Sequence, residues 1–180
     1  MKYIAWCALT ALFCGTALVQ AERMQRASLK SVERTFDDRL QRLTGDPFEL
    51  LGNTRGVYLD GYGAVFTSEV NLIVSPTINP FRLKLTKEET DAVHERKLKK
   101  LSVLKQDMQE MLLSASATLS DMPPSEKIVV AVTLFNYNYE ITTGLPGQIV
   151  MRGERRKLLD VQAGRSSKSA LPGVISVEEI

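Results

Sequence analysis

The stretch YLDGYGAVFTSEVNLIV, from Tyr58 to Val74, decides the fold class of this chain of 180 residues. Its centre holds Asp60-Gly61, a pair typical of a two-residue hairpin turn in which both positions have positive φ. The run after the turn places apolar side chains on one face and mixed ones on the other, as in a sheet covered fully on one side only. We therefore predict two paired strands over residues 55–74, with Gly63 letting the second strand bend or pass close to other backbone.

Helical periodicity appears on both sides of this hairpin. Apolar residues recur at three- and four-residue steps over residues 22–43 and again over 87–119. Thr86 and Glu89 form a capping-box signature at the start of the second helix. Because this helix is long for the domain, it either crosses the whole sheet or projects its charged first turns beyond it.

Further strands are predicted after the long helix. The run from Lys127 to Glu140 begins with IVVAVTLF, which is apolar on both faces and favours a central place in the sheet. A short strand over 148–152 and a short helix over 154–161 follow, and the closing VISVEEI alternates well enough for an edge strand.

This order of elements predicts an α+β fold. Strands in pairs separated by one helix indicate a two-layer domain with a mostly antiparallel sheet, on which the long helix and the N-terminal helix pack. We expect a signal peptide at 1–21, a single domain at 22–163, and a flexible tail at 164–180 that can end in an edge strand.

The first residues have the pattern of a secretory signal peptide. Lys2 precedes an uncharged apolar run, and Val19 and Ala21 are the small residues expected ahead of cleavage before Glu22. The alternative of an uncleaved anchor is disfavoured because the run is shorter than the roughly 20 residues that span a membrane. We therefore expect an exported protein, periplasmic or secreted.

Composition restricts the available chemistry. Cys7 and Cys14 both lie in the predicted signal peptide, so the mature chain is expected to lack disulfides, thiolate zinc sites and cysteine nucleophiles. His94 is the single histidine and lies among charged residues of a helix, which favours neither a catalytic triad nor a zinc site. A formal net charge of +2 gives no general argument for nucleic acid. No metal or cofactor is expected.

Three carboxylates are the candidates for catalysis. Asp60 and Glu69 flank the predicted hairpin, and Glu140 ends the central strand. Two carboxylates about 5 to 9 Å apart in a cleft can catalyse hydrolysis of a polymer. Their spacing in the sequence does not require them to converge, and Asp60 is explained equally well by its turn.

Candidates for binding fall into three groups: the mixed face of the hairpin, a segment of alternating asparagine and tyrosine, and a basic cluster. Exposed tyrosine and asparagine suit adaptable recognition, whereas tyrosines on a covered face are core. The basic cluster can either clamp an anionic partner or form the solvated face of a short helix. The candidates are Thr67, Asn71, Asn136, Tyr137, Asn138, Tyr139, Arg152, Arg155 and Arg156.

The stretch RGVYLDGYGAVFTSEVNLIVSP, with the long helix and the run KIVVAVTLF, resembles a type of exported bacterial protein with no assigned activity. The resemblance covers about residues 50–160 and brings no catalytic motif. It implies export from a bacterial cell and implies no molecular function.

Three functions are compatible with these patterns. The leading hypothesis is a non-enzymatic envelope or secreted module that binds or assembles with a protein or another envelope component, and not with nucleic acid. One alternative is a small hydrolase acting on an envelope polymer through the three carboxylates. The other is a peripheral membrane protein held by the basic amphipathic helix at 22–43. The oligomeric state is left open.

Overall fold

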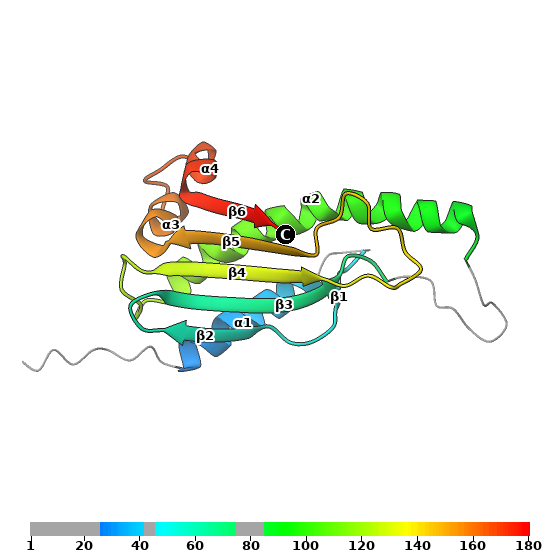
Figure 1. Ribbon diagram of the computed structural model, residues 1–180. Helices are drawn as coiled ribbons and strands as arrows, with labels where there is room; N and C mark the ends of the chain where they lie inside the picture. The colour runs from blue at the N-terminus through cyan, green and yellow to red at the C-terminus, as the bar shows by residue number, and fades with distance from the viewer. Residues whose placement is uncertain (1–25, 42–45, 75–84) are drawn as a thin grey trace, which may run out of the picture.

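Helices and strands form two layers in the computed structural model, which describes residues 26–41, 46–74 and 85–180 (Figure 1). The predicted signal peptide and both ends of the predicted helix 22–43 lie outside the described residues. The elements follow in the order α1 (Arg26–Gln41), β1 (Glu49–Leu50), β2 (Arg55–Leu59), β3 (Gly63–Asn71), α2 (Lys87–Thr118), β4 (Lys127–Leu134), β5 (Gln148–Glu154), α3 (Arg155–Gln162), η1 (Lys168–Ala170), α4 (Leu171–Val174) and β6 (Ile175–Glu179).

The sheet has the strand order β1-β3-β4-β5-β6, and β2 also pairs with β3. All pairs are antiparallel except β3 with β4, which are parallel. A parallel pair needs a crossover connection, and α2 lies in the connection between these two strands. The predicted α+β fold with a mostly antiparallel sheet and one long helix is therefore confirmed, and the apolar run of β4 occupies the predicted central position.

The hairpin of β2 and β3 forms, but its turn differs from the prediction. Asp60, Gly61 and Tyr62 separate the strands, and the Tyr62 N–H donates to the carbonyl of Leu59 at 3.0 Å. Among the described residues only glycines have positive φ, so Gly61 (φ 74°) has it and Asp60 does not. The predicted two-residue turn with two positive φ values is wrong, because one glycine at the second central position is enough for this turn.

Gly63 lies where β3 passes directly against the backbone of β4. Its φ is 133°, and a Cβ added there would lie 1.9 Å from the carbonyl oxygen of Lys127. The Lys127 N–H also donates to the carbonyl of Tyr62 at 2.9 Å, which closes the parallel pair at this end. The expected close backbone approach at Gly63 is confirmed.

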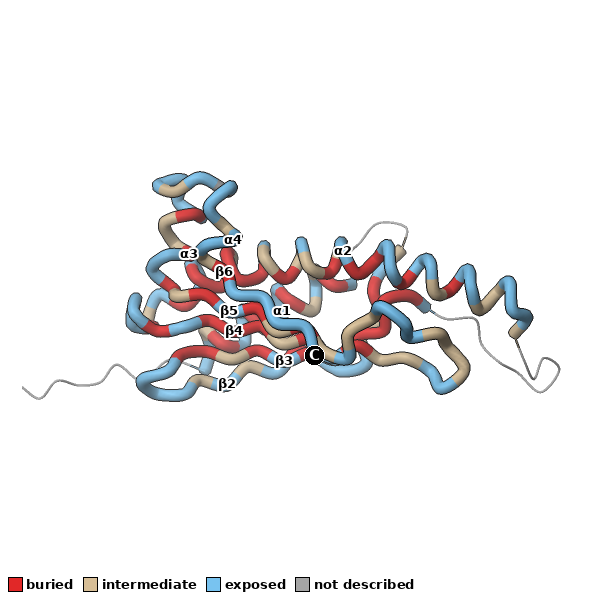
Figure 2. The backbone as a smooth tube through the Cα atoms, turned by 45° about the horizontal axis from the view of Figure 1, so that its top comes forward, coloured by how far each residue is buried: buried red, intermediate tan, exposed pale blue. Residues whose placement is uncertain are grey.

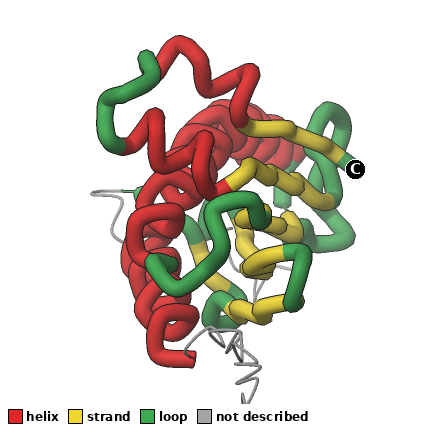
Figure 3. Tube along the Cα trace, turned by 90° about the vertical axis from the view of Figure 1, so that its left-hand side faces the viewer, coloured by secondary structure: helices red, strands yellow, loops and turns green. Residues whose placement is uncertain are grey.

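The core lies between the helices and one face of the sheet, as the buried segments in Figure 2 show. Apolar residues at helical spacing line the inner side of α2, as predicted. Phe36 of α1 contacts Phe66 of β3 with ring centroids 5.2 Å apart. Figure 3 shows the helices gathered on one side of the strands. The buried apolar residues of α1 are Leu29, Val32, Phe36 and Leu40, and those predicted for α2 are Leu101, Leu104, Met108, Met111, Leu112 and Ala115.

The first turns of α2 extend beyond the strands, where the chain after β4 lies along them (Figure 1). The capping box is present: the Glu89 N–H donates to Thr86 Oγ1 at 3.3 Å, and the Thr86 N–H donates to Glu89 Oε2 at 2.9 Å. The extended part of the helix is therefore covered by a loop and not by the sheet.

The strand predicted from Lys127 to Glu140 is shorter than expected. β4 ends at Leu134, and residues 136–140 leave the sheet in a turn closed by a hydrogen bond from the Glu140 N–H to the carbonyl of Tyr137 at 3.0 Å. The alternation of asparagine and tyrosine over residues 136–139 predicted a longer strand, but Asn136 and Glu140 instead bind Lys97 of α2. At the other end of the chain, VISVEEI contributes β6, which pairs with β5 as an edge strand.

Candidate functional site

The sheet face opposite the helices is the candidate binding surface. α1 and α3 reach the other face, where Phe36 contacts Phe66 and Leu158 lies about 3 Å from a Cβ built on Gly153. No helix in the described ranges packs on the opposite side, where Val57 is 51% exposed and Leu59 is 47% exposed. We call this surface the open face, and its members are Arg55, Val57, Leu59, Val65, Thr67, Glu69, Lys127, Val129, Ala131, Thr133, Gln148, Val150, Arg152, Glu154, Ser176 and Glu178.

Strand register places an apolar centre on the open face. Val57 lies opposite Val65, which lies opposite Val129 in β4. Ala131 and Val150 form the next pair across β4 and β5. Charged and hydroxyl side chains flank this centre on both sides, so the face combines the apolar centre and polar rim that are common in protein interfaces.

A shallow pocket of about 280 Å³ lies at one end of the open face. The structure brings Thr67 and Glu69 together there, and Arg55, Asn53 and Thr133 complete the polar lining. The loop before β2 is fixed because the Thr54 N–H donates to Asp37 Oδ1 at 2.8 Å and Thr54 Oγ1 lies 2.8 Å from Ser68 Oγ. The pocket offers donors and acceptors of both charge signs to a polar ligand group.

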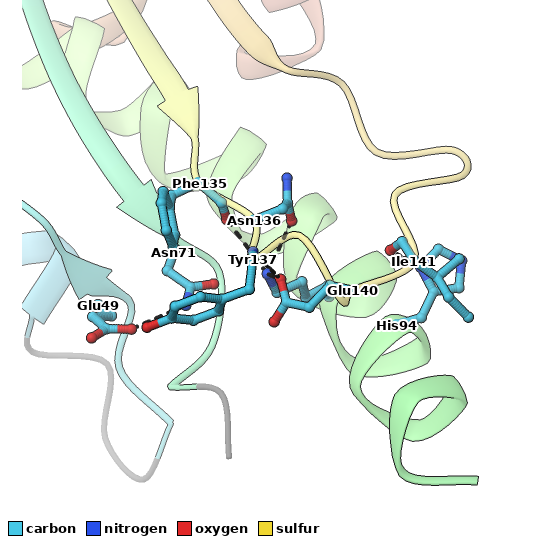
Figure 4. A network of polar contacts seen from close by, with 9 residues as sticks. Glu49, Asn71, His94, Phe135, Asn136, Tyr137, Glu140 and Ile141 are labelled. Atoms are coloured by element: carbon cyan, nitrogen blue, oxygen red, sulfur yellow. Dashed lines mark hydrogen bonds and ion pairs between the residues drawn. The ribbon is translucent and has the colours of Figure 1, made fainter. Parts of the chain in front are cut away.

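Asn71 is not part of this pocket. Although it follows Thr67 and Glu69 in the alternation, it is fully buried, and its Nδ2 donates to Glu49 Oε2 at 3.0 Å. Its Oδ1 has no hydrogen-bond partner among the described residues. The expectation that Asn71 is an open-face binding residue is therefore wrong, because β1 and the chain after β4 enclose this end of the sheet (Figure 4).

The structure does not bring Asp60, Glu69 and Glu140 together. Asp60 lies in the turn before β3, and Glu69 lies six residues beyond Gly63, which corresponds to about 20 Å along a strand. Glu140 has a side chain that is 1% exposed and forms an ion pair with Lys97. A two-carboxylate mechanism needs a separation of about 5 to 9 Å, so these residues do not support one.

Glu140 belongs to a buried cluster that joins the loop to α2 (Figure 4). The Nζ of Lys97 donates to Glu140 Oε2 at 2.5 Å, to Asn136 Oδ1 at 2.9 Å and to the carbonyl of Phe135 at 3.4 Å. Glu140 Oε2 also accepts from the Tyr137 N–H at 3.0 Å. Asn136 and Glu140 therefore hold the loop on the helix and do not face a ligand.

The tyrosines of this loop stack on each other. The rings of Tyr137 and Tyr139 are nearly parallel, with centroids 5.2 Å apart, and Tyr137 meets Phe135 edge-on at 5.0 Å. Tyr137 and Asn138 are exposed, whereas burial raises the pKa of Tyr139. The asparagines and tyrosines thus do not form the two faces of a strand, and only Tyr137 and Asn138 remain open to a partner.

His94 has a structural contact in the same region. Its Nδ1 lies 2.9 Å from the carbonyl oxygen of Ile141, which joins α2 to the end of the loop (Figure 4). Within the described ranges no group of three or more histidine, cysteine, aspartate or glutamate residues could hold a metal ion.

The basic cluster separates into one buried arginine and two exposed ones. Arg155 is 8% exposed, and it donates to the carbonyls of Ser116 at 3.1 Å and Met122 at 2.8 Å. Burial lowers the pKa of Arg155. Arg155 therefore does not lie on the solvated face of the helix, because its donors hold the C-terminal end of α2. Arg156 and Arg152 are exposed, and Arg152 lines a pocket of about 350 Å³ with Lys127 and Lys157.

Glu126 is a buried carboxylate that the sequence did not single out. It is 8% exposed, and its Oε1 accepts from the Tyr58 hydroxyl at 3.1 Å and from the Gly61 N–H at 3.2 Å. Glu126 comes directly before β4, far from the hairpin in sequence, so no local pattern indicated this contact. It fixes the Asp60-Gly61 turn to the start of the central strand.

The hydroxyl of Tyr58 is expected to ionise at a much higher pH than that of an ordinary tyrosine. Burial and its hydrogen bond to Glu126 raise its pKa from 10 to about 12. Because folding favours the protonated phenol, its stabilising contribution is complete below pH 10 and is lost as pH rises from 10 to 12. Difference spectra at alkaline pH between the parent chain and Tyr58→Phe should therefore show tyrosinate appearing near pH 12, and appearance near pH 10 would contradict the contact. Tyr62→Phe, at an exposed site, is the control.

Comparisons with protein-family models, with curated proteins and with solved structures found no match to this chain. Among the described helices, none combines the length and the apolar character that crossing a membrane requires.

Proposed function

We propose that this chain is an exported, non-enzymatic binding or assembly module whose open face contacts another protein. The observation that carries the proposal is the apolar centre of the open face, where Val57 is half exposed between the polar pocket of Thr67 and Glu69 at one end and the half-exposed Leu59 at the other. Isolated exposed apolar residues are ordinary, but here the exposed Val57 continues through the half-buried Val65 to the buried Val129, and an apolar centre with a polar rim is typical of an interaction surface.

The charge of the face favours a protein partner. The open face carries three basic and three acidic residues, and the whole chain has a formal net charge of +2: Arg55, Lys127 and Arg152 lie on it with Glu69, Glu154 and Glu178. A polyanion is better matched by a surface of one sign. The signal-peptide pattern predicted for residues 1–21 supports export to the periplasm or the medium.

The alternatives receive less support. The hydrolase needs carboxylates that converge, and Glu140 is instead enclosed with Lys97. A membrane anchor through α1 needs its apolar side, but Leu29, Val32 and Phe36 are at most 5% exposed. The proposal therefore involves neither catalysis by the carboxylates nor a membrane anchor at α1.

The proposal can be tested by site-specific photocrosslinking in cells that produce the full chain. A photoreactive amino acid at Val57 should give one defined protein adduct, whereas the same amino acid at Arg34, on the exposed side of α1, should give none. The intact mass of the uncrosslinked chain from the same cells reports whether residues 1–21 have been removed.

A second variant tests whether formation of the adduct depends on the open face. Thr67→Arg places a bulky charge beside the apolar centre and should lower the adduct yield at position 57 by about fivefold or more. Because the new arginine lies opposite Arg55, a small fall in melting temperature is expected, and the yields are compared well below the melting transition. Equal adducts from positions 57 and 34, or an adduct unaffected by Thr67→Arg, would refute a specific interface on this face.

A further inference from the structure

The two edges of the sheet differ in whether other parts of the chain form hydrogen bonds with their outward backbone groups. At β2, Arg26 Nη1 donates to the carbonyl of Gly56 at 2.7 Å, and the Gly56 N–H donates to Glu33 Oε1 at 2.8 Å. Arg26 and Glu33 also form an ion pair at 2.9 Å. Side chains of α1 thus occupy both backbone groups of Gly56 and obstruct the addition of another strand at this edge.

The edge at β6 is open. Gln148 and Ile180 exchange both backbone hydrogen bonds at 3.0 Å, so Glu178 and Ser176 also face β5 in the antiparallel alternation. The N–H and C=O groups of Val177 and Glu179 therefore point away from the sheet. No described residue makes a hydrogen bond to these two N–H groups. Such a row of unpaired groups is a template for one more strand.

Side chains beside this edge indicate the composition of that strand. Val177 lies on the helix side, pairs with Met151, and is 44% exposed. Glu178 lies on the open face, where its ion pair with Arg152 is long at 3.6 Å and its side chain is 52% exposed. An incoming strand would therefore meet an apolar side chain on one face and an incompletely paired carboxylate on the other.

A second copy of β6 fits this edge poorly. Antiparallel pairing centred on Val177 would place the copy's Glu179 opposite Ile175, whose N–H already donates to the carbonyl of Leu171 at the end of α4. Pairing centred on Glu178 would place two glutamates directly opposite each other, which is destabilising. The free edge is short and suits a narrow extended segment. Glu179 is paired with Lys105 at 2.7 Å, so the incompletely paired charge beside the edge is the carboxylate of Glu178.

We propose that the β6 edge binds an extended segment of a partner protein by strand addition, and that this segment alternates apolar and basic side chains. An apolar residue covers Val177, and a lysine or arginine lies opposite Glu178. The backbone groups of Val177 and Glu179 supply the hydrogen bonds. This edge is a separate surface from the apolar centre of the open face, so the inference does not rest on the proposed function.

The test uses the purified full chain with two blocked peptides, Val-Lys-Val-Lys-Val and Val-Glu-Val-Glu-Val. The lysine peptide should slow amide hydrogen exchange at Val177 and Glu179, should leave the backbone of β2 unchanged, and should bind about fivefold more tightly than the glutamate peptide. Glu178→Lys should reverse this preference. Glu69→Lys, on the open face away from the edge, should leave it unchanged and separates this site from the proposed interface.

Three results would overturn the inference. The first is unchanged exchange at Val177 and Glu179 in the presence of saturating lysine peptide. The second is a peptide preference that Glu178→Lys does not reverse. The third is protection of the two amides that appears without peptide as the protein concentration rises, because a second copy would then occupy the edge.

Discussion

Lys97→Met is expected to lower the free energy of unfolding by about 3 to 5 kcal/mol. The side chains of Lys97 and Glu140 are 0% and 1% exposed, and their charged atoms lie 2.5 Å apart. Removing the ammonium leaves a buried carboxylate without its cation, and water cannot reach it unless the loop leaves α2. The change is measured by urea unfolding followed by circular dichroism.

The double variant Lys97→Met with Glu140→Gln should recover more than half of this loss. A glutamine at position 140 still accepts from the Tyr137 N–H, and no uncompensated charge remains in the interior. Lys105→Met is the matched control on α2, because its ion pair with Glu179 is partly exposed and should contribute at most about 1 kcal/mol. Additive losses in the double variant would show that the two charges do not stabilise each other.

This cluster also shows where prediction from sequence fails. The helices followed from apolar periodicity, the hairpin from its Asp60-Gly61 turn and alternating strands, and the central strand from a run that is apolar on both faces. Each of these patterns lies within one continuous stretch of the chain. Lys97, in a highly charged run, gave no sign that the chain after β4 covers it. Its partner lies 43 residues away, and a contact at that separation leaves no periodic pattern.

The candidate site residues also include some whose placement the sequence predicted and some whose burial it did not predict. Thr67 and Glu69 were placed on the open face by alternation within one strand, and the structure brings both to one pocket. Asn71 follows the same alternation but is enclosed by Glu49 and the chain after β4. Arg155 resembles its exposed neighbours in sequence, yet its donors hold carbonyls at the end of α2. Alternation within a strand predicts on which side of the sheet a side chain lies. Whether that side chain is buried depends on segments that are distant in the sequence.

Gly63→Ala is expected to destabilise the fold by about 4 kcal/mol or more. The new Cβ would lie 1.9 Å from the carbonyl oxygen and 2.7 Å from the nitrogen of Lys127. Both are backbone atoms, so no rotamer change can relieve the clash. The parallel pair of β3 and β4, which joins the hairpin to the centre of the sheet, would have to separate at this end. Urea unfolding again gives the free energy.

Two other glycines separate backbone strain from the clash. Gly61 has φ of 74° with no atom within 4 Å of an added Cβ, so Gly61→Ala should cost only the strain of a left-handed residue, about 1 to 2 kcal/mol. Gly52 has open space and no positive φ, and Gly52→Ala should change stability by less than about 1 kcal/mol in either direction. If Gly63→Ala costs no more than Gly61→Ala, the backbones of β3 and β4 are not in contact at Gly63. If it costs more, the excess contains the clash with Lys127 and the greater strain of an alanine at φ 133°, both of which follow from the way β3 passes against β4 at Gly63.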